Sequence, residues 1–110
     1  MSPLQFFKCL SDDTRLKSIL IISQLEEVCV CDLMAALELD QHKVSRHLAE
    51  LRKCHILKDK RRGKWVYYQL HEQLPDWAIN VIKQTAEENS SYFSEAITKL
   101  DASKQQAPLC

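Results

Sequence analysis

The chain is poor in the residues that interrupt helices. Its 110 residues include a single glycine, Gly63, and only three prolines, at positions 3, 75 and 108. Glycine and proline are the strongest local breakers of regular structure, so their scarcity predicts a mostly helical protein with few tight turns. A chain of this length forms one domain with one hydrophobic core, which is thin for an isolated monomer.

Long apolar stretches are also lacking. No run of eighteen apolar residues occurs, so the sequence offers no candidate for a membrane-spanning helix. The first residues lack the basic start and apolar stretch of a signal peptide. We therefore expect a cytoplasmic protein without a membrane partner. Five cysteines in such a protein predict reduced thiols, and their odd number does not fit a simple disulfide framework.

A net charge of one sign is absent, but the charges are not evenly spread. The chain carries 15 basic and 15 acidic residues, which gives a formal net charge of zero. Residues 41–70 hold nine of the basic residues and only two acidic ones, Glu50 and Asp59. Positive charge concentrated in one short stretch is typical of a surface that binds a polyanion, although a solvated helix face gives some clustering too.

The hydrophobic pattern predicts about five helices and one β-hairpin. The helices are expected at residues 4–10, 12–25, 30–39, 41–53 and 76–100, with Ser11 or Asp12 capping the second and Asp40 the fourth. β-Branched and aromatic residues on both sides of a basic turn with Gly63 predict the hairpin within residues 56–70. We expect one domain over residues 1–100 and a flexible tail over residues 101–110.

The helix over residues 41–53 and the basic hairpin that follows it favour a winged helix-turn-helix. Val44, Leu48 and Leu51 form one apolar stripe, which leaves a polar outer face. A helix fits the major groove of B-form DNA, where base edges can be distinguished, and a basic hairpin tip can reach phosphates or the minor groove. The predicted DNA-contacting residues are Gln41, His42, Ser45 and Arg46 at the bases, Lys43 and His47 at the backbone, and Lys60, Arg61, Arg62 and Lys64 in the wing.

Three segments carry a resemblance to a known family. Residues 7–16 are similar to its N-terminal signature, residues 44–52 to its recognition helix and residues 63–70 to its wing. The order and the span, about residues 4–100, make the chain resemble the ArsR/SmtB family of winged-helix repressors. That resemblance implies a homodimer formed through the first and last helices, bound to an inverted-repeat operator in double-stranded DNA. His55 stands where the family commonly has glycine, and histidine tolerates the left-handed conformation better than most residues.

Two cysteines lie one residue apart at the start of the predicted third helix. Exposed amides at a helix N-terminus stabilise thiolates, and soft, thiophilic ions select thiolate ligands. One buried cysteine is usually a small core residue, but the spacing of Cys29 and Cys31 favours a ligand site. A disulfide between residues so close would be strained, which argues against redox pairing within the motif.

The segment Cys29-Val30-Cys31-Asp32-Leu33 resembles the arsenic-sensing branch of the family, in which a third cysteine follows and the motif binds trivalent arsenic or antimony. The resemblance implies an inducer of this kind, inorganic or organic, and no required cofactor. The third position is here Met34, whose weak thioether is typical of packing. Hydroxide or an organic substituent could complete a two-thiolate site. A distant thiol could do so too, and the candidates are Cys110, Cys9 and Cys54.

Other interpretations keep the DNA binding but change the signal. A disulfide between distant cysteines would make the repressor redox-responsive, and soft divalent ions such as cadmium or lead could use the same thiols. The zinc or nickel site that the family places on its last helix is disfavoured, because residues 76–100 contain no histidine. An enzyme is not expected, because the sequence has neither a phosphate-binding glycine loop nor a Cys-x-x-Cys motif.

Overall fold

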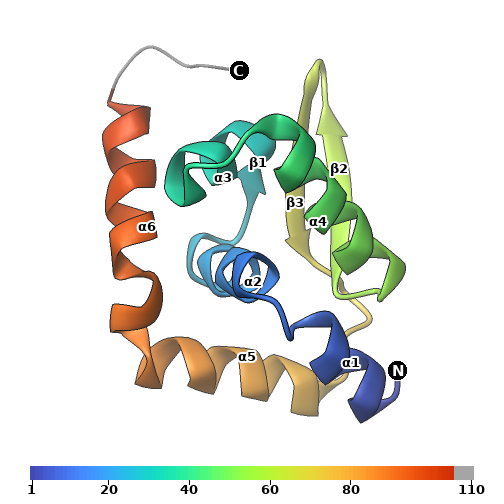
Figure 1. The fold of residues 1–110 in the computed structure, drawn as a ribbon. Helices are drawn as coiled ribbons and strands as arrows, with labels where there is room; N and C mark the ends of the chain where they lie inside the picture. The colour runs from blue at the N-terminus through green and yellow to red at the C-terminus, as the bar shows by residue number, and fades with distance from the viewer. Residues whose placement is uncertain (106–110) are drawn as a thin grey trace.

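A computed structural model of the protein describes residues 1–105. Over this span the order of the elements is α1 (Pro3–Cys9), α2 (Asp13–Leu25), β1 (Val28–Cys29), α3 (Val30–Leu37), α4 (Gln41–Lys53), β2 (Leu57–Arg62), β3 (Trp65–Leu70), α5 (Asp76–Glu88) and α6 (Ser90–Lys104). Figure 1 shows the helices arranged around α2, with the β-hairpin on one side. The predicted fold class, mainly helical with a winged helix-turn-helix, is therefore confirmed.

The predicted last helix is two helices. The chain turns sharply at Asn89, whose φ of −133° and ψ of 40° do not continue α5 (Figure 1). The Asn89 side chain donates to the Thr85 carbonyl oxygen over 3.0 Å and so occupies an acceptor at the end of α5. The described residues accordingly contain six helices rather than about five. The run of polar residues from 87 to 91 was the signal for this break.

The middle of α2 forms the centre of the core. Ile19, Leu20, Ile21 and Ile22 are all fully buried, so this part of the helix is covered on every side. A helix that is apolar around its whole circumference is typical of the interior of a domain. The other helices and the sheet pack around it, which fixes their positions relative to one another (Figure 1).

The sheet has three strands in the described residues, in the order β1-β3-β2, and both pairings are antiparallel. The hairpin was expected, whereas the two-residue strand β1 was not. In β1, Val28 pairs with Tyr68 and Cys29 pairs with Tyr67. The sheet therefore joins the segment that begins α3 to the wing.

At several turns the structure has the caps and backbone conformations that the sequence predicts. Asp12 and Asp40 cap α2 and α4 by accepting hydrogen bonds from backbone N–H groups over 3.0 and 2.9 Å. His55, after α4, has φ of 58°, the left-handed conformation expected there, and Gly63 in the hairpin turn has φ of 62°. A helix α6 that continues to Lys104 passes the predicted domain boundary at residue 100, and residues 106–110 of the predicted tail lie outside the described residues.

None of the helices within residues 1–105 combines the length and the apolar character that crossing a membrane requires.

Candidate DNA interface and thiol site

The outer face of α4 presents most of the residues predicted to meet DNA. Gln41, His42, Lys43 and Arg46 are exposed, and Ser45 is half-buried. The opposite face is buried, since Val44, Leu48 and Leu51 are at most 1% exposed. The hydrogen bond from the Lys43 N–H to Asp40 starts the helix at Gln41, so the first turn carries the polar residues.

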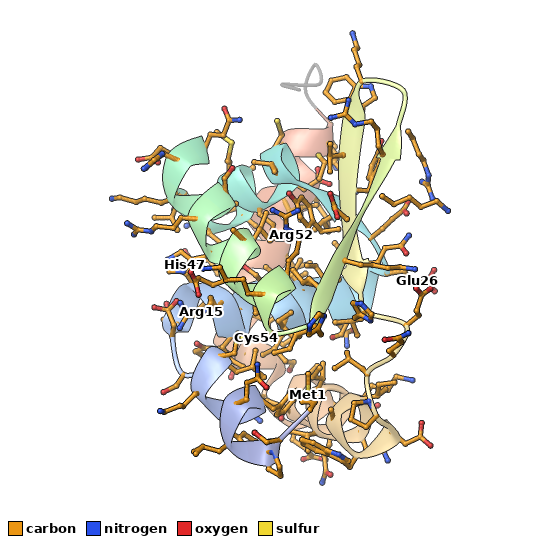
Figure 2. All side chains as sticks on the ribbon, turned by 90° about the vertical axis from the view of Figure 1, so that its right-hand side faces the viewer. Met1, Arg15, Glu26, His47, Arg52 and Cys54 are labelled. Carbon is orange, nitrogen blue, oxygen red and sulfur yellow. The ribbon has the colours of Figure 1, made fainter. Side chains whose placement is uncertain are left out.

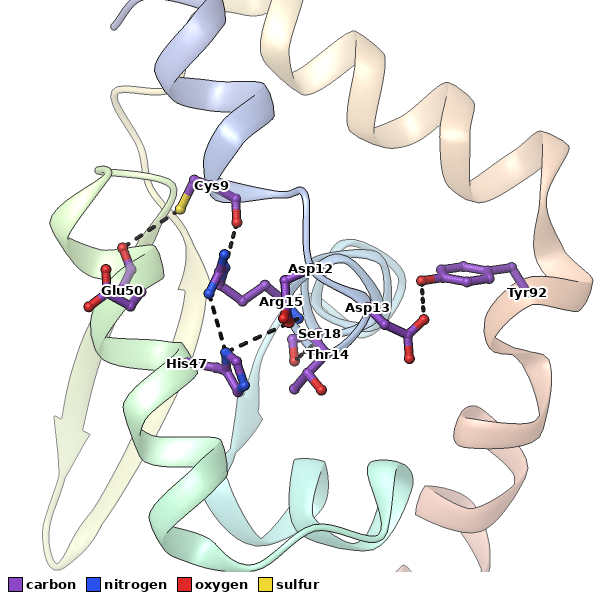
Figure 3. A network of polar contacts seen from close by, with 9 residues as sticks. All are labelled: Cys9, Asp12, Asp13, Thr14, Arg15, Ser18, His47, Glu50 and Tyr92. Carbon is purple, nitrogen blue, oxygen red and sulfur yellow. Dashed lines mark hydrogen bonds and ion pairs between the residues drawn. The ribbon is translucent and has the colours of Figure 1, made fainter.

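His47 differs from its neighbours because it faces the start of α2. Its Nδ1 atom lies 3.7 Å from an Asp12 carboxylate oxygen and 3.4 Å from an Arg15 guanidinium nitrogen (Figure 3). Only 17% of the His47 side chain is exposed. Arg15 in turn donates from Nε to the Cys9 carbonyl oxygen over 2.6 Å. His47 thus joins α4 to α1 and α2, a connection that the helical pattern alone did not reveal.

The wing carries exposed cations at its tip, including Lys60, Arg61 and Lys64. The Lys64 ammonium lies 5.3 Å from the centre of the Trp65 ring. The Arg62 guanidinium lies 5.2 Å from the centre of the Tyr67 ring, and it also forms an ion pair with Glu27. Cations held over aromatic rings keep a defined direction, which suits contact with phosphates.

Glu27 links the wing to the segment that carries the paired cysteines. Its carboxylate accepts hydrogen bonds from Arg62 on β2 and from the Gln69 amide on β3, the latter over 2.9 Å. The hydrogen bond from Arg62, followed by that from Gln69, lowers the pKa of Glu27 below its usual value. The carboxylate is thus held as an anion between the wing strands, next to β1. Sequence reasoning missed this residue because its partners lie 35 and 42 positions away.

Cys29 stands where β1 ends and α3 begins. It is the N-cap residue of α3, and the Asp32 carboxylate accepts a hydrogen bond from its backbone N–H over 3.0 Å. This is a reciprocal capping box, because the Asp32 N–H also points to the Cys29 side chain. Cys31 lies in the first turn of the helix. Both predicted ligand residues are half-buried, in a segment joined to β3 by the sheet.

The groups around Cys29 have opposite effects on the pKa of its thiol. Burial raises the pKa of the Cys29 thiol, and the Asp32 carboxylate adds to the rise, whereas the N–H groups of Asp32 and Cys31 lower it. The stabilisation of a thiolate by helix amides, expected from the sequence, is therefore present but is outweighed. Met34 is half-buried and packs against the core, as a thioether in this position was expected to do.

Residues 1–105 contain no group of three His, Cys, Asp or Glu side chains placed to hold a metal ion. Of the candidate third ligands, Cys9 ends α1 and Cys54 caps the end of α4, while Cys110 lies outside the described residues. Figure 1 shows α1 and the end of α4 toward the opposite end of the domain from β1 and the start of α3. Within residues 1–105, Cys29 and Cys31 are thus the cysteines that lie at this end of the domain.

Comparison with known proteins identifies the family. Residues 12–59 match the model described as "Bacterial regulatory protein, arsR family". The arsenic resistance transcriptional regulator ArsR1 of Pseudomonas putida is 46% identical over 100 residues, which cover 91% of this chain and 78% of that protein. The chain belongs to the ArsR family. ArsR-family proteins are DNA-binding transcriptional regulators and not enzymes, as the sequence predicted.

Two further relatives of this ArsR-family protein are informative. The arsenical resistance operon repressor of Escherichia coli is 50% identical over 82 residues, which cover 74% of this chain and 70% of that protein. The solved structure of the AntR antimony-specific transcriptional repressor is 26% identical and has a TM-score of 0.63, covering 78% of this chain and 75% of that one. The family assignment and its repressor members together make this chain an ArsR-family repressor.

Proposed function

We propose that this repressor binds an inverted-repeat operator as a homodimer, through α4 and the wing, and leaves DNA when trivalent arsenic or antimony binds Cys29 and Cys31. Organic forms of these metalloids are included, because a substituent can occupy the third position on the arsenic. No resident cofactor is required.

The charge and exposure of two elements support the DNA contact. The cations predicted for it, from Lys43 on α4 to Lys64 in the wing, are exposed with the exception of the His47 side chain. Opposite charges would hold these elements against phosphates, and the first turn of α4 would offer Gln41, His42, Ser45 and Arg46 to base edges. His47 serves this surface indirectly in our proposal, because it holds α4 against α2.

An exposed aromatic cluster supports the homodimer. Phe7 on α1 and Trp77 on α5 are 52% and 37% exposed, and both contact the buried Phe6, with ring centres 5.1 Å apart in each pair. Leu4, also on α1, is 69% exposed. Apolar side chains gathered on one face of a small domain are typical of a subunit interface. The interface predicted for the first and last helices would thus use α1 and α5, the first half of the predicted last helix.

The position of Cys29 is the observation that carries the proposed trigger. Cys29 pairs with Tyr67 of the wing strand and also caps α3, the helix that packs against α4. A metalloid that draws Cys29 and Cys31 together would distort the capping box and the last pair of the β1–β3 ladder. A change at this one site would then move both α4 and the wing. The ion pair between Glu27 and Arg62 adds a charged link between the β1 segment and the wing.

The names of the relatives support this class of inducer. One is an arsenic resistance regulator, one an arsenical resistance operon repressor and one an antimony-specific repressor. An inducer releases DNA only if it binds the DNA-free form more tightly than the DNA-bound form. A hundredfold preference corresponds to about 2.7 kcal/mol, enough to empty an operator held near its threshold.

The test is arsenite titration of a labelled operator complex. For the wild type we expect release, and for Cys29→Ser/Cys31→Ser we expect unchanged DNA affinity with at least about a hundredfold more arsenite required. Met34→Leu is the matched control, since it changes a half-buried sulfur-containing side chain of α3 that packs against the core, and it should respond as the wild type. Normal arsenite release from the double variant would contradict the proposal. So would release of the wild type by cadmium or peroxide but not by arsenite or antimonite.

A further inference from the structure

The thiol of Cys9 lies against the last turn of α4, which carries Cys54. The Cys9 Sγ donates a hydrogen bond to the Glu50 carbonyl oxygen over 3.7 Å (Figure 3). The Cys54 N–H donates to the same oxygen over 3.2 Å. The Cys54 side chain lies close enough to contribute to the raised pKa of the Cys9 thiol. Two cysteines 45 positions apart in the sequence therefore face each other across the contact between α1 and α4.

A cavity of about 430 Å³ lies beside this pair, and both thiols contribute to its lining. The walls also include the apolar side chain of Leu4 and the cationic side chains of Lys8 and Arg15. Cys9 is 7% exposed, whereas Cys54, labelled at the end of α4 in Figure 2, is half-buried. A small solute that enters the cavity can thus meet both sulfur atoms.

The surroundings favour a neutral Cys9 thiol. Burial, followed by the hydrogen bond with Cys54, raises the pKa of Cys9 to about 12. Oxidation by peroxide begins with attack by a thiolate, so a neutral thiol resists it. Soft divalent cations bind thiolates and have to displace protons. A neutral trivalent metalloid hydroxide needs no preformed thiolate, because each hydroxide that leaves takes up one thiol proton, and the product adds no net charge to a partly buried site.

We propose that Cys9 and Cys54 form a second dithiol site, separate from Cys29 and Cys31, which binds a neutral trivalent arsenic or antimony hydroxide. Two S–H bonds and two bonds from arsenic to hydroxide break, two arsenic–sulfur bonds form, and two water molecules leave. Arsenic stays trivalent and retains one hydroxide, so neither an oxidant nor a reductant is needed. The cavity has room for that hydroxide.

Occupation of this site would connect two elements with different roles. Cys9 ends α1, which carries the exposed aromatic residue Phe7, and Cys54 directly follows the DNA-reading helix. An arsenic bridge would tie the proposed dimer surface to the end of α4. The inference extends the proposed function without depending on it, because it concerns different thiols and is measured by metalloid uptake rather than by DNA release.

The experiment uses the full chain with Cys29→Ser, Cys31→Ser and Cys110→Ser, which keeps Cys9 and Cys54. Arsenite is titrated under reducing conditions, and binding is followed by the sulfur-to-arsenic absorption band and by the number of thiols left to react. We expect one arsenic per chain and protection of both thiols. Adding Cys54→Ser, or Cys54→Ala as a second version, should weaken arsenite binding at least about tenfold through loss of chelation. Lys8→Ala, which changes the same cavity but no thiol, should leave the affinity unchanged.

The proposal is overturned if the triple variant, folded by circular dichroism and still bound to DNA, takes up no arsenite. It is also overturned if binding persists at full affinity without Cys54, or if peroxide closes a Cys9–Cys54 disulfide in a variant that ignores arsenite. The proposed function is tested separately by arsenite-dependent release of DNA from the wild type, so either idea can fail while the other stands.

Discussion

The two pairs of cysteines occupy opposite ends of helices. Cys29 and Cys31 lie at the N-terminus of α3, whereas Cys9 is the last residue of α1 and Cys54 follows the last residue of α4. Exposed N–H groups at a helix N-terminus favour negative charge, and exposed carbonyl groups at a C-terminus disfavour it. The Cys29 sulfur accordingly has two N–H groups that lower its pKa, while the Cys9 thiol points to a carbonyl oxygen.

Burial raises the pKa of the cysteine thiol in both regions, so the electrostatic difference between the regions comes from the local backbone. Desolvation is the largest cause of the raised pKa for Cys29 and for Cys9. Only at Cys29 do neighbouring amides offset part of it. The amides of α3 therefore favour a thiolate at Cys29 relative to Cys9, although burial raises the pKa of both thiols.

The largest expected effect is on alkylation of the two sites. Because the pKa of Cys9 is raised to about 12, only about one Cys9 in a thousand is a thiolate at about pH 9. We expect iodoacetamide to modify Cys29 at least about tenfold faster than Cys9 in the reduced protein near this pH. The gap should close as the pH rises toward about 12. Peptide mapping by mass spectrometry measures both rates.

Unfolding in urea provides the control for the alkylation experiment, since all cysteines should then react at similar rates. Equal rates for Cys9 and Cys29 in the folded protein would remove the distinction between the two regions. Faster reaction of Cys9 would reverse it.

A second prediction concerns how each region connects to the DNA-reading surface. Glu27→Gln removes the charge that holds Arg62 beside β1, so the wing should respond less to events at Cys29. We expect unchanged arsenite affinity but roughly fivefold more arsenite for half-release of DNA. Binding and release are measured separately, by absorbance and by operator titration.

Glu72→Gln is the matched control for Glu27→Gln. Glu72 is also paired with a cation of the hairpin, Lys58, over 2.7 Å, but it lies after β3 and away from β1. This variant should behave as the wild type. Equal effects of the two substitutions would show that loss of any surface ion pair weakens release, and the link through Glu27 would then be rejected.

The sequence allowed prediction of what depends on local pattern. The caps Asp12 and Asp40, the stripe of α4 and the left-handed His55 all follow from a few neighbouring residues, and each is present. The spacing of Cys29 and Cys31 also marks them as a pair. The ladder between Cys29 and Tyr67 was not predictable, because a two-residue strand has no hydrophobic period to read.

The features that the sequence did not predict depend on contacts between distant segments of the chain. The facing of Cys9 and Cys54 depends on how α1 packs against α4, and nothing in either local sequence specifies that. His47 shows the same limit, since its helix position suggested a contact with the DNA backbone while the fold directs it to Asp12. The polar residues before Asn89 did signal a helix break, but the apolar period continued across it.

The smallest expected effect separates the charge of Asp32 from its role as a cap. The Asp32 carboxylate raises the pKa of Cys29, so Asp32→Asn should lower that pKa and shift the alkylation profile of Cys29 to lower pH. The asparagine carbonyl oxygen can still accept from the Cys29 N–H, so α3 keeps its first turn and stability should fall by only about 0.5 kcal/mol, measured by urea unfolding. The profile of Cys9 should not move, because Asp32 is not among the groups that act on it. A shift of the Cys29 profile to higher pH would mean that loss of the capping box weakens the hydrogen bonds from the α3 amides to the sulfur. The effect of the cap on the pKa of Cys29 would then be larger than the effect of the Asp32 charge. A shift of both cysteines together would show that the two regions are not electrostatically independent.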